Sequence, residues 1–172
     1  FTTGSVSGAL NTGFGGGFYG LTNYGRAPSS SGVYAEATTW SLDTWGEYLL
    51  AVSSTDGKLL EWQGNTSLNA ATVANAPTGN NAMVVTEERF VFCLGAGGNP
   101  RKVQWSDKEN NTVWNATATN EAGDMELQTN GQIMCGVRMR GATLILTDTD
   151  AHVATYSGAP FVYGFQRVGT AC

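Results

Sequence analysis

The feature that most constrains the fold is a strand–turn–strand pattern that occurs three times along the chain, at residues 46–62, 88–105 and 140–156. Each copy has an apolar run, a turn rich in glycine or aspartate, and a second run that ends in an aromatic residue. These aromatic residues are 43 and then 51 positions apart, namely Trp62, Trp105 and Tyr156. Internal repeats of this length that consist of strands are typical of β-propeller blades, which bury their faces by stacking.

Each hairpin follows a further strand-like run, so that a blade of four strands is expected. The predicted strands are residues 38–45, 48–52, 82–86, 90–94, 102–105, 133–137, 142–147 and 161–165. No segment has the i, i+3, i+4, i+7 apolar spacing of a helix. The sequence therefore predicts an all-β fold of antiparallel four-stranded blades. Three blades cannot close a ring, so we expect a larger propeller whose remainder comes from a longer chain or from partners.

The first 32 residues differ from the rest, because they are rich in glycine and poor in branched apolar residues. We expect residues 1–32 to form an extended arm or linker and residues 33–172 to carry about three blades. Gly15, Gly17 and Gly20 match the spacing of a dinucleotide-binding fingerprint. That fingerprint requires a strand before it and a helix after it. Neither is predicted here, so we expect no cofactor.

The composition limits the classes of function. Charged residues make up 13% of the chain, against roughly 25% in an ordinary domain, and such surfaces suit a protein packed into an assembly. The net charge is −5 with nine Lys and Arg, whereas DNA binding needs clustered cations. The cysteines Cys93, Cys135 and Cys172 are odd in number and widely spaced, which predicts reduced thiols. No apolar run is long enough to span a bilayer.

Asp148, Asp150 and His152 stand at alternate positions, which share one face of a strand. They could ligate a metal, but no further acidic residue follows at the spacing of a calcium loop. His152 is the only histidine, which excludes a zinc site with several histidines. We interpret the three as a polar hairpin turn and expect no metal site.

Two rival functions involve other side chains. A depolymerising enzyme would need a carboxylate pair, drawn from Glu87, Glu88, Glu121, Asp124 and Glu126. No serine-nucleophile motif is present, and we expect no catalytic residues. A receptor- or glycan-binding module would stack sugars on exposed tryptophans, drawn from Trp45, Trp62, Trp105 and Trp114. Blade packing accounts for these rings more simply, and the expected core residues are Phe90, Phe92, Trp105, Leu144 and Leu146.

Several motifs together resemble those of bacteriophage virion proteins. They are the stretches 40–51, 103–107, 118–123, 144–148 and 158–165, with Trp114 between the second and the third. The chain is similar to the tail tubular or nozzle proteins of short-tailed phages, including relatives that stabilise packaged DNA. Members of that family are much longer than 172 residues.

The resemblance implies a structural subunit of the phage tail and not an enzyme. Such proteins are built around β-propellers and form a ring, usually hexameric, below the head-to-tail connector. The expected partners are the connector or adaptor, the tail fibre or needle, and further copies of the chain. DNA would pass through the lumen without specific binding. The expected location is the virion, after assembly in the cytoplasm of a bacterial host.

Overall fold

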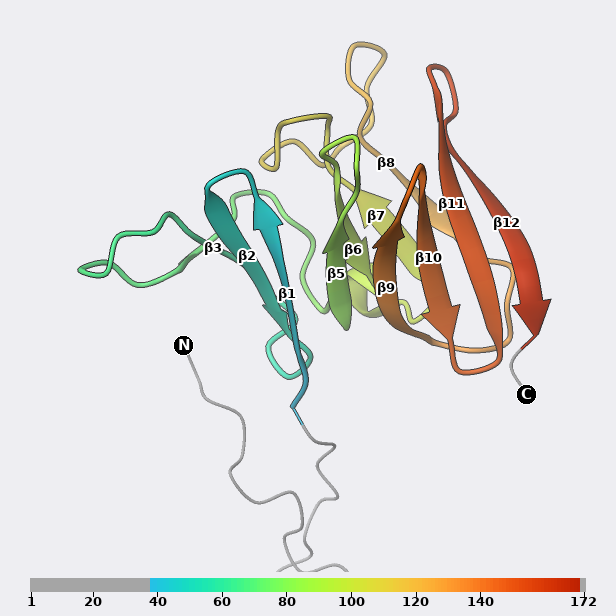
Figure 1. The fold of residues 1–172 in the computed structure, drawn as a ribbon, viewed down its shortest axis with the longest axis horizontal. Helices are drawn as coiled ribbons and strands as arrows, with labels where there is room; N and C mark the ends of the chain where they lie inside the picture. Colours follow the sequence, from blue (N-terminus) through green and yellow to red (C-terminus); the bar gives the residue numbers. More distant parts are fainter. Residues whose placement is uncertain (1–37, 171–172) are drawn as a thin grey trace, which may run out of the picture. The chain divides into compact units, whose positions relative to one another are not determined.

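The computed structural model describes residues 38–170 and contains twelve strands, with no α-helix in that range (Figure 1). The predicted glycine-rich arm over residues 1–32 lies outside the described residues. The strands are β1 (Trp40–Trp45), β2 (Tyr48–Ser53), β3 (Leu59–Trp62), β4 (Ala71–Thr72), β5 (Ala82–Val85), β6 (Val91–Leu94), β7 (Lys102–Trp105), β8 (Gly123–Glu126), β9 (Ile133–Met139), β10 (Ala142–Thr147), β11 (Asp150–Gly158) and β12 (Val162–Thr170). A short 3₁₀ turn, η1 (Ala96–Gly98), lies between β6 and β7.

The strands form three separate four-stranded sheets, β1–β4, β5–β8 and β9–β12. Within each sheet the strands follow one another in sequence order, and every neighbouring pair is antiparallel. The predicted all-β class and the four-stranded antiparallel units are therefore confirmed. This topology is compatible with propeller blades, which are also meanders of four strands.

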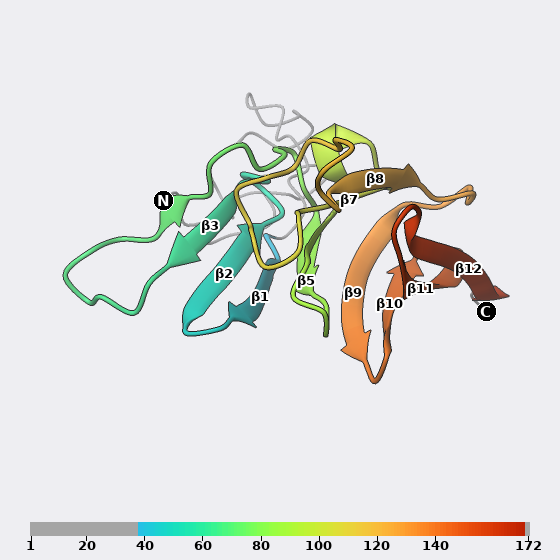
Figure 2. The same ribbon diagram turned by 90° about the horizontal axis from the view of Figure 1, so that it is seen from above.

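The sheets meet through their first strands, β1, β5 and β9 (Figure 2). The hydroxyl of Ser41 on β1 donates a hydrogen bond of 2.7 Å to the carbonyl of Met83 on β5. The backbone N–H of Val85 donates to the Asp43 carboxylate at 2.9 Å. Gly136 on β9 lies against Val84 and Leu94, so closely that an added Cβ would be 2.9 Å from each side chain.

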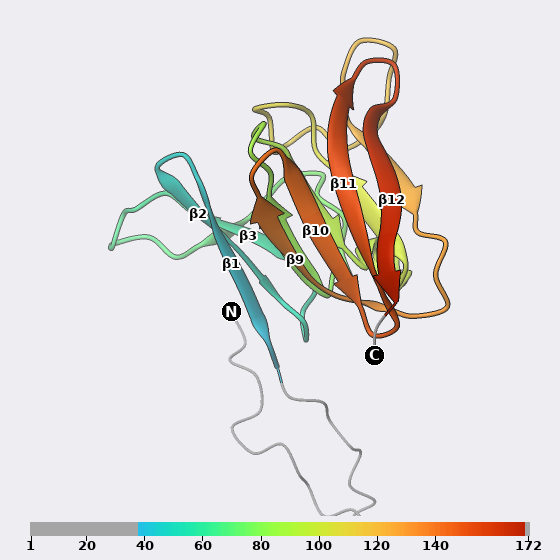
Figure 3. The same cartoon turned by 45° about the vertical axis from the view of Figure 1, so that its right-hand side comes forward.

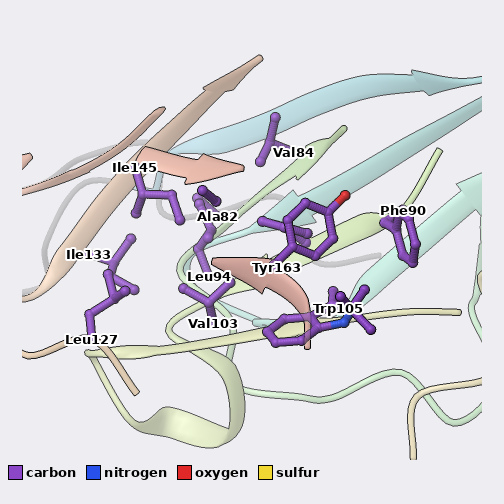
Figure 4. Close-up of a cluster of buried hydrophobic side chains, with 13 residues drawn as sticks. Ala82, Val84, Phe90, Leu94, Val103, Trp105, Leu127, Ile133, Ile145 and Tyr163 are labelled. Atoms are coloured by element: carbon purple, nitrogen blue, oxygen red, sulfur yellow. The ribbon is translucent and has the colours of Figure 1, made fainter. Parts of the chain in front are cut away.

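The middle sheet is buried on both faces, because it lies between the other two sheets. Side chains alternate along its strands, so each strand contributes to both clusters. On β6, Phe92 and Leu94 belong to the cluster shared with β9–β12, which Figure 4 shows. Their neighbours Val91 and Cys93 belong to the cluster shared with β1–β4. Sheets covered on both faces have nearly continuous apolar strands, as β5 and β6 do.

The second strand of each sheet presents matching residues to the same side, although the hairpin registers differ: Trp62 lies opposite Leu49, whereas Trp105 lies opposite Phe92, one position further along its copy. Leu50 and Val52 of β2 face the middle sheet, just as Phe92 and Leu94 of β6 face the third sheet. The matching residues of β10 are Leu144 and Leu146, which lie opposite Val137 and Cys135 of β9. We call this side of each sheet its front face and the opposite side its back face.

The core assignment was wrong for two of the five expected residues. Phe90, Phe92 and Trp105 are buried, whereas Leu144 and Leu146 are only partly buried. The intervening Ile145 is fully buried, because it is on the back face and packs against the middle sheet. In the described part of the chain, no further sheet covers the front face of β9–β12 (Figure 3).

Candidate functional site

An open cleft of about 750 Å³ lies between the β8–β9 loop, the β10–β11 turn and β12. Nine of its ten lining residues are polar, and the exception is Leu127. The charged members come in pairs. Arg101 forms an ion pair with Glu126 on the rim, and Arg167 Nη1 lies 4.0 Å from Asp150 Oδ2. The cleft is therefore polar but close to electrically neutral.

Asp150 is the most deeply placed charged residue of this cleft, since its side chain is only 5% exposed. Its Oδ1 accepts hydrogen bonds from the hydroxyls of Thr147 at 2.6 Å and Thr129 at 2.9 Å. His152 Nε2 lies 3.0 Å from the same oxygen. No hydrogen bond to Oδ2 occurs within residues 38–170, because Arg167 is too far away for one.

These contacts also determine the acidity of Asp150. Burial raises the pKa of the carboxyl, but the hydrogen bonds from Thr147 and Thr129 and the nearby His152 more than offset this effect. The net result is a pKa below the ordinary value. Asp150 is therefore a carboxylate at neutral pH, with three partners on one oxygen.

Local hydrogen bonds hold the walls of the cleft in place. The hydroxyl of Thr129 accepts the backbone N–H of Gly131 at 3.0 Å. The Asp148 carboxylate accepts the N–H of Gln132 at 2.9 Å, which ties the β10–β11 turn to the β8–β9 loop. A Cβ at position 131 would overlap the Asp148 carboxylate, so a larger residue there would have to displace that side chain.

Of the three alternate residues Asp148, Asp150 and His152, the structure brings only two together. Asp150 and His152 are buried and adjacent, whereas Asp148 is exposed and bonded to the neighbouring loop. Within the described residues, no three His, Cys, Asp or Glu side chains are placed to hold a metal ion. Thr129 and Arg167 were missed by sequence reasoning, because they reach Asp150 only through the sheet topology.

The five candidate carboxylates each have a structural partner. Glu88 accepts a hydrogen bond from the hydroxyl of Tyr163 at 3.1 Å, and Glu121 accepts one from Tyr156 at 3.1 Å. Glu87 accepts a hydrogen bond from the backbone N–H of Gly141. Asp124 forms an ion pair with Lys102, and Glu126 forms one with Arg101.

The two tyrosine rings meet edge to face, with centroids 5.6 Å apart. Tyr163 belongs to the hydrophobic cluster of Figure 4, and Tyr156 packs against that cluster. Burial raises the pKa of Tyr156, and the adjacent Glu121 raises it further. Burial likewise raises the pKa of Tyr163, with Glu88 adding to the effect. Both hydroxyls are therefore protonated hydrogen-bond donors that hold the carboxylates to the core.

The tryptophans offer little surface to a sugar. Trp45, Trp105 and Trp114 are each less than 10% exposed, and Trp62 is partly buried. Trp105 Nε1 donates to the carbonyl of Glu121 at 2.8 Å. These rings are packing elements, so a stacking platform cannot be built from the three buried ones.

Among the cysteines, Cys93 is buried and free, and its burial raises the pKa of the thiol. Cys135 is free and partly buried, while Cys172 lies outside the described range. The glycine fingerprint at Gly15, Gly17 and Gly20 also lies outside it. No helix long and apolar enough to cross a membrane occurs in residues 38–170.

Comparison with known proteins identifies no relative: no family model, no curated protein and no solved structure matches this chain.

Proposed function

We propose that this chain is a structural part of a bacteriophage tail protein of the nozzle class. In this proposal its three sheets are blades of a β-propeller that further sheets complete. The protein forms a ring of six copies, and its neighbours in the tail are the connector and the tail fibre or needle. The ring retains packaged DNA and conducts it during ejection.

The observation that carries the proposal is the chemistry of the two outer sheet faces. The front face of β9–β12 presents only uncharged, mainly aliphatic side chains, including Cys135, Val137, Leu144, Leu146 and Val153. They are at most partly buried, and Val137 is 51% exposed. Apolar surfaces of this kind on a soluble domain mark interaction sites.

The back face of β1–β4 has the same character. Leu42, Leu49, Ala51 and Leu60 share this face with Trp62, and none of its paired positions is charged. Leu42 is 60% exposed. Inside the chain, a front face packs on a back face twice, so each outer face is suited to one more sheet of the same kind. A propeller needs about four to eight blades, which agrees with this requirement.

The charge balance suits a conduit. The chain has fourteen Asp and Glu against nine Lys and Arg, and Arg138 of β9 lies 3.8 Å from Asp43. Phosphate contacts supply nonspecific DNA affinity and each needs an available cation. A wall with few free cations lets DNA slide, because it does not grip the backbone.

The test is to locate the protein in virions. Antibodies raised against residues 39–170 are applied with gold labels to particles of a short-tailed phage that encodes the chain. The expected result is labelling at the tail vertex. An amber mutant in the gene should give filled heads that lose their DNA, and complementation by the wild-type gene should restore retention. Labelling of the capsid shell, or mutant particles that retain DNA and infect normally, would refute the proposal.

A glycan-binding module is the second candidate, and one observation favours it. The tryptophans do not supply a platform, but the polar cleft around Asp150 supplies a site of different chemistry.

The depolymerising enzyme gains no support, because all five candidate carboxylates are engaged by structural partners.

A further inference from the structure

Asp150 Oδ2 is a carboxylate oxygen that accepts no hydrogen bond within residues 38–170 and is open to the cleft. The Asp150 side chain is 5% exposed, and within residues 38–170 only Asn80 Oδ1 is a fully buried side-chain polar atom without a partner, so Oδ2 keeps contact with the cleft. Here Oδ1 has three partners, whereas Oδ2 has only Arg167 Nη1 at 4.0 Å. Asp150 lines the cleft, so a group that enters the cleft can reach this acceptor.

The 4.0 Å separation between Asp150 Oδ2 and Arg167 Nη1 is too long for a direct hydrogen bond. It is suited to one bridging oxygen, which at about 2.8 Å from each atom donates to the carboxylate and accepts from the guanidinium. A hydroxyl group does both, since it carries one donor and two acceptor sites. A carboxylate or phosphate oxygen lacks the proton, and an ammonium group lacks the lone pair.

The charges of the cleft lead to the same ligand class. Two cations, Arg101 and Arg167, face two anions, Glu126 and Asp150. An anionic ligand would be attracted by the two arginines but repelled by the two carboxylates. A cationic ligand would be attracted by the carboxylates but repelled by the arginines. The other polar lining groups are neutral amides and hydroxyls, such as Gln128, Asn130 and Thr170. A neutral ligand with many hydroxyls satisfies them without disturbing either ion pair.

We propose that this cleft binds a neutral saccharide, with one sugar hydroxyl bridging Asp150 Oδ2 and the Arg167 guanidinium. The volume of about 750 Å³ lies within the range of roughly 300–1,000 Å³ typical of small-molecule sites. The hydrogen bonds through Thr129 and Asp148 hold the walls before the ligand arrives, which lowers the entropy cost of binding. The inference does not rest on the phage-tail function, and it applies to the chain in any assembly.

The site is tested by ¹H–¹⁵N NMR titration of the full chain with glucose, galactose, N-acetylglucosamine, maltose and lactose. At least one sugar should shift the amides of Thr129, Thr149 and Asp150 saturably, with an affinity in the millimolar range. Arg167→Ala should weaken that binding at least tenfold. Arg140→Ala, an exposed arginine in the β9–β10 turn, is the matched control and should leave binding unchanged.

Two further probes separate the saccharide from other ligands. Sodium phosphate and triglycine are titrated under the same conditions, and Asp150→Asn tests the acceptor if that variant folds. If phosphate or the peptide shifts these amide signals and no sugar does, the cleft is an anion or peptide site and the proposal is overturned. The absence of saturable shifts with all five sugars would overturn it too, as would unchanged sugar binding by Arg167→Ala.

Discussion

At the level of single residues, Phe92 packs the second sheet against the third. Its ring lies 4.7 Å from that of Tyr163 in an edge-to-face arrangement and 6.0 Å from that of Trp105. Its side chain is completely buried. Aromatic pairs of this kind add stability beyond that of the buried area alone.

Replacing Phe92 with alanine should therefore destabilise the fold by about 3–5 kcal/mol, because it removes the ring and leaves a cavity between two sheets. Urea unfolding followed by tryptophan fluorescence measures the loss. Val137→Ala is the control, because that side chain is 51% exposed, and it should change the free energy of unfolding little. Similar values for the two variants would mean that Phe92 does not support the inter-sheet core.

Asp150 should make stability depend on pH in the acid range. Its pKa is lowered in the folded chain, from about 3.9 in the unfolded chain, so the folded state binds this proton less readily. The carboxylate therefore stabilises the fold fully above the unfolded pKa, and this contribution is lost as the pH falls through the folded pKa. The Tm of wild type should fall more steeply below about pH 4 than that of Asp150→Asn. Parallel curves for the two proteins would contradict this assignment.

At the level of strands and sheets, the sequence predicts the inner strands well and the outer ones poorly. The residues of β7 and β10 match the predicted ranges, because β7 alternates polar and apolar residues and β10 is a mainly apolar run, each bounded by turn residues. In contrast, β4 and β8 were not predicted. Both residues of β4 are exposed, and β8 carries Asp124 and Glu126 beside Met125. Outer strands with one or both faces in water lack the apolar run on which the prediction depends.

The candidate site was less predictable than the fold. The sequence marks Asp150 and His152 as a pair, because alternate residues on a strand share a face. It gives no sign that Thr129 and Arg167 lie beside them. Those contacts arise from the packing of the β8–β9 loop against the third sheet, which no local pattern encodes.

The close approach of β9 to the middle sheet depends on Gly136. Valine at this position should destabilise the fold by about 1–3 kcal/mol, because its Cβ would meet Val84 and Leu94 at 2.9 Å. Gly169→Val on β12 is the matched control, since nothing lies within 4 Å of its Cβ position. It should be neutral or slightly stabilising, because valine favours strands. Thermal unfolding of both variants tests this, and equal Tm values would argue against close packing at Gly136.

At the level of the whole described unit, the two outer faces are chemically alike, because the paired positions of both are uncharged and mainly aliphatic. One is the front of the last sheet and the other is the back of the first, so they are not the same patch. An interface between unlike patches of two copies is head-to-tail, and it propagates unless rotation closes a ring. Within residues 38–170 no further sheet covers either face, so each face can accept one.

The isolated 172-residue chain should therefore self-associate in a concentration-dependent way, and lysines on the outer faces should prevent it. The double variant Leu42→Lys with Val137→Lys places a charge on each face, at side chains that are 60% and 51% exposed, so the fold should survive. Leu68→Lys is the control, because Leu68 is 66% exposed but lies in the loop between β3 and β4.

Added lysines bring the net charge of −5 closer to zero, which by itself favours association. A shift of the double variant towards monomer must then come from the faces themselves. Sedimentation velocity over a dilution series distinguishes the species, and a wild-type chain that stays monomeric throughout would show that neither face accepts another sheet.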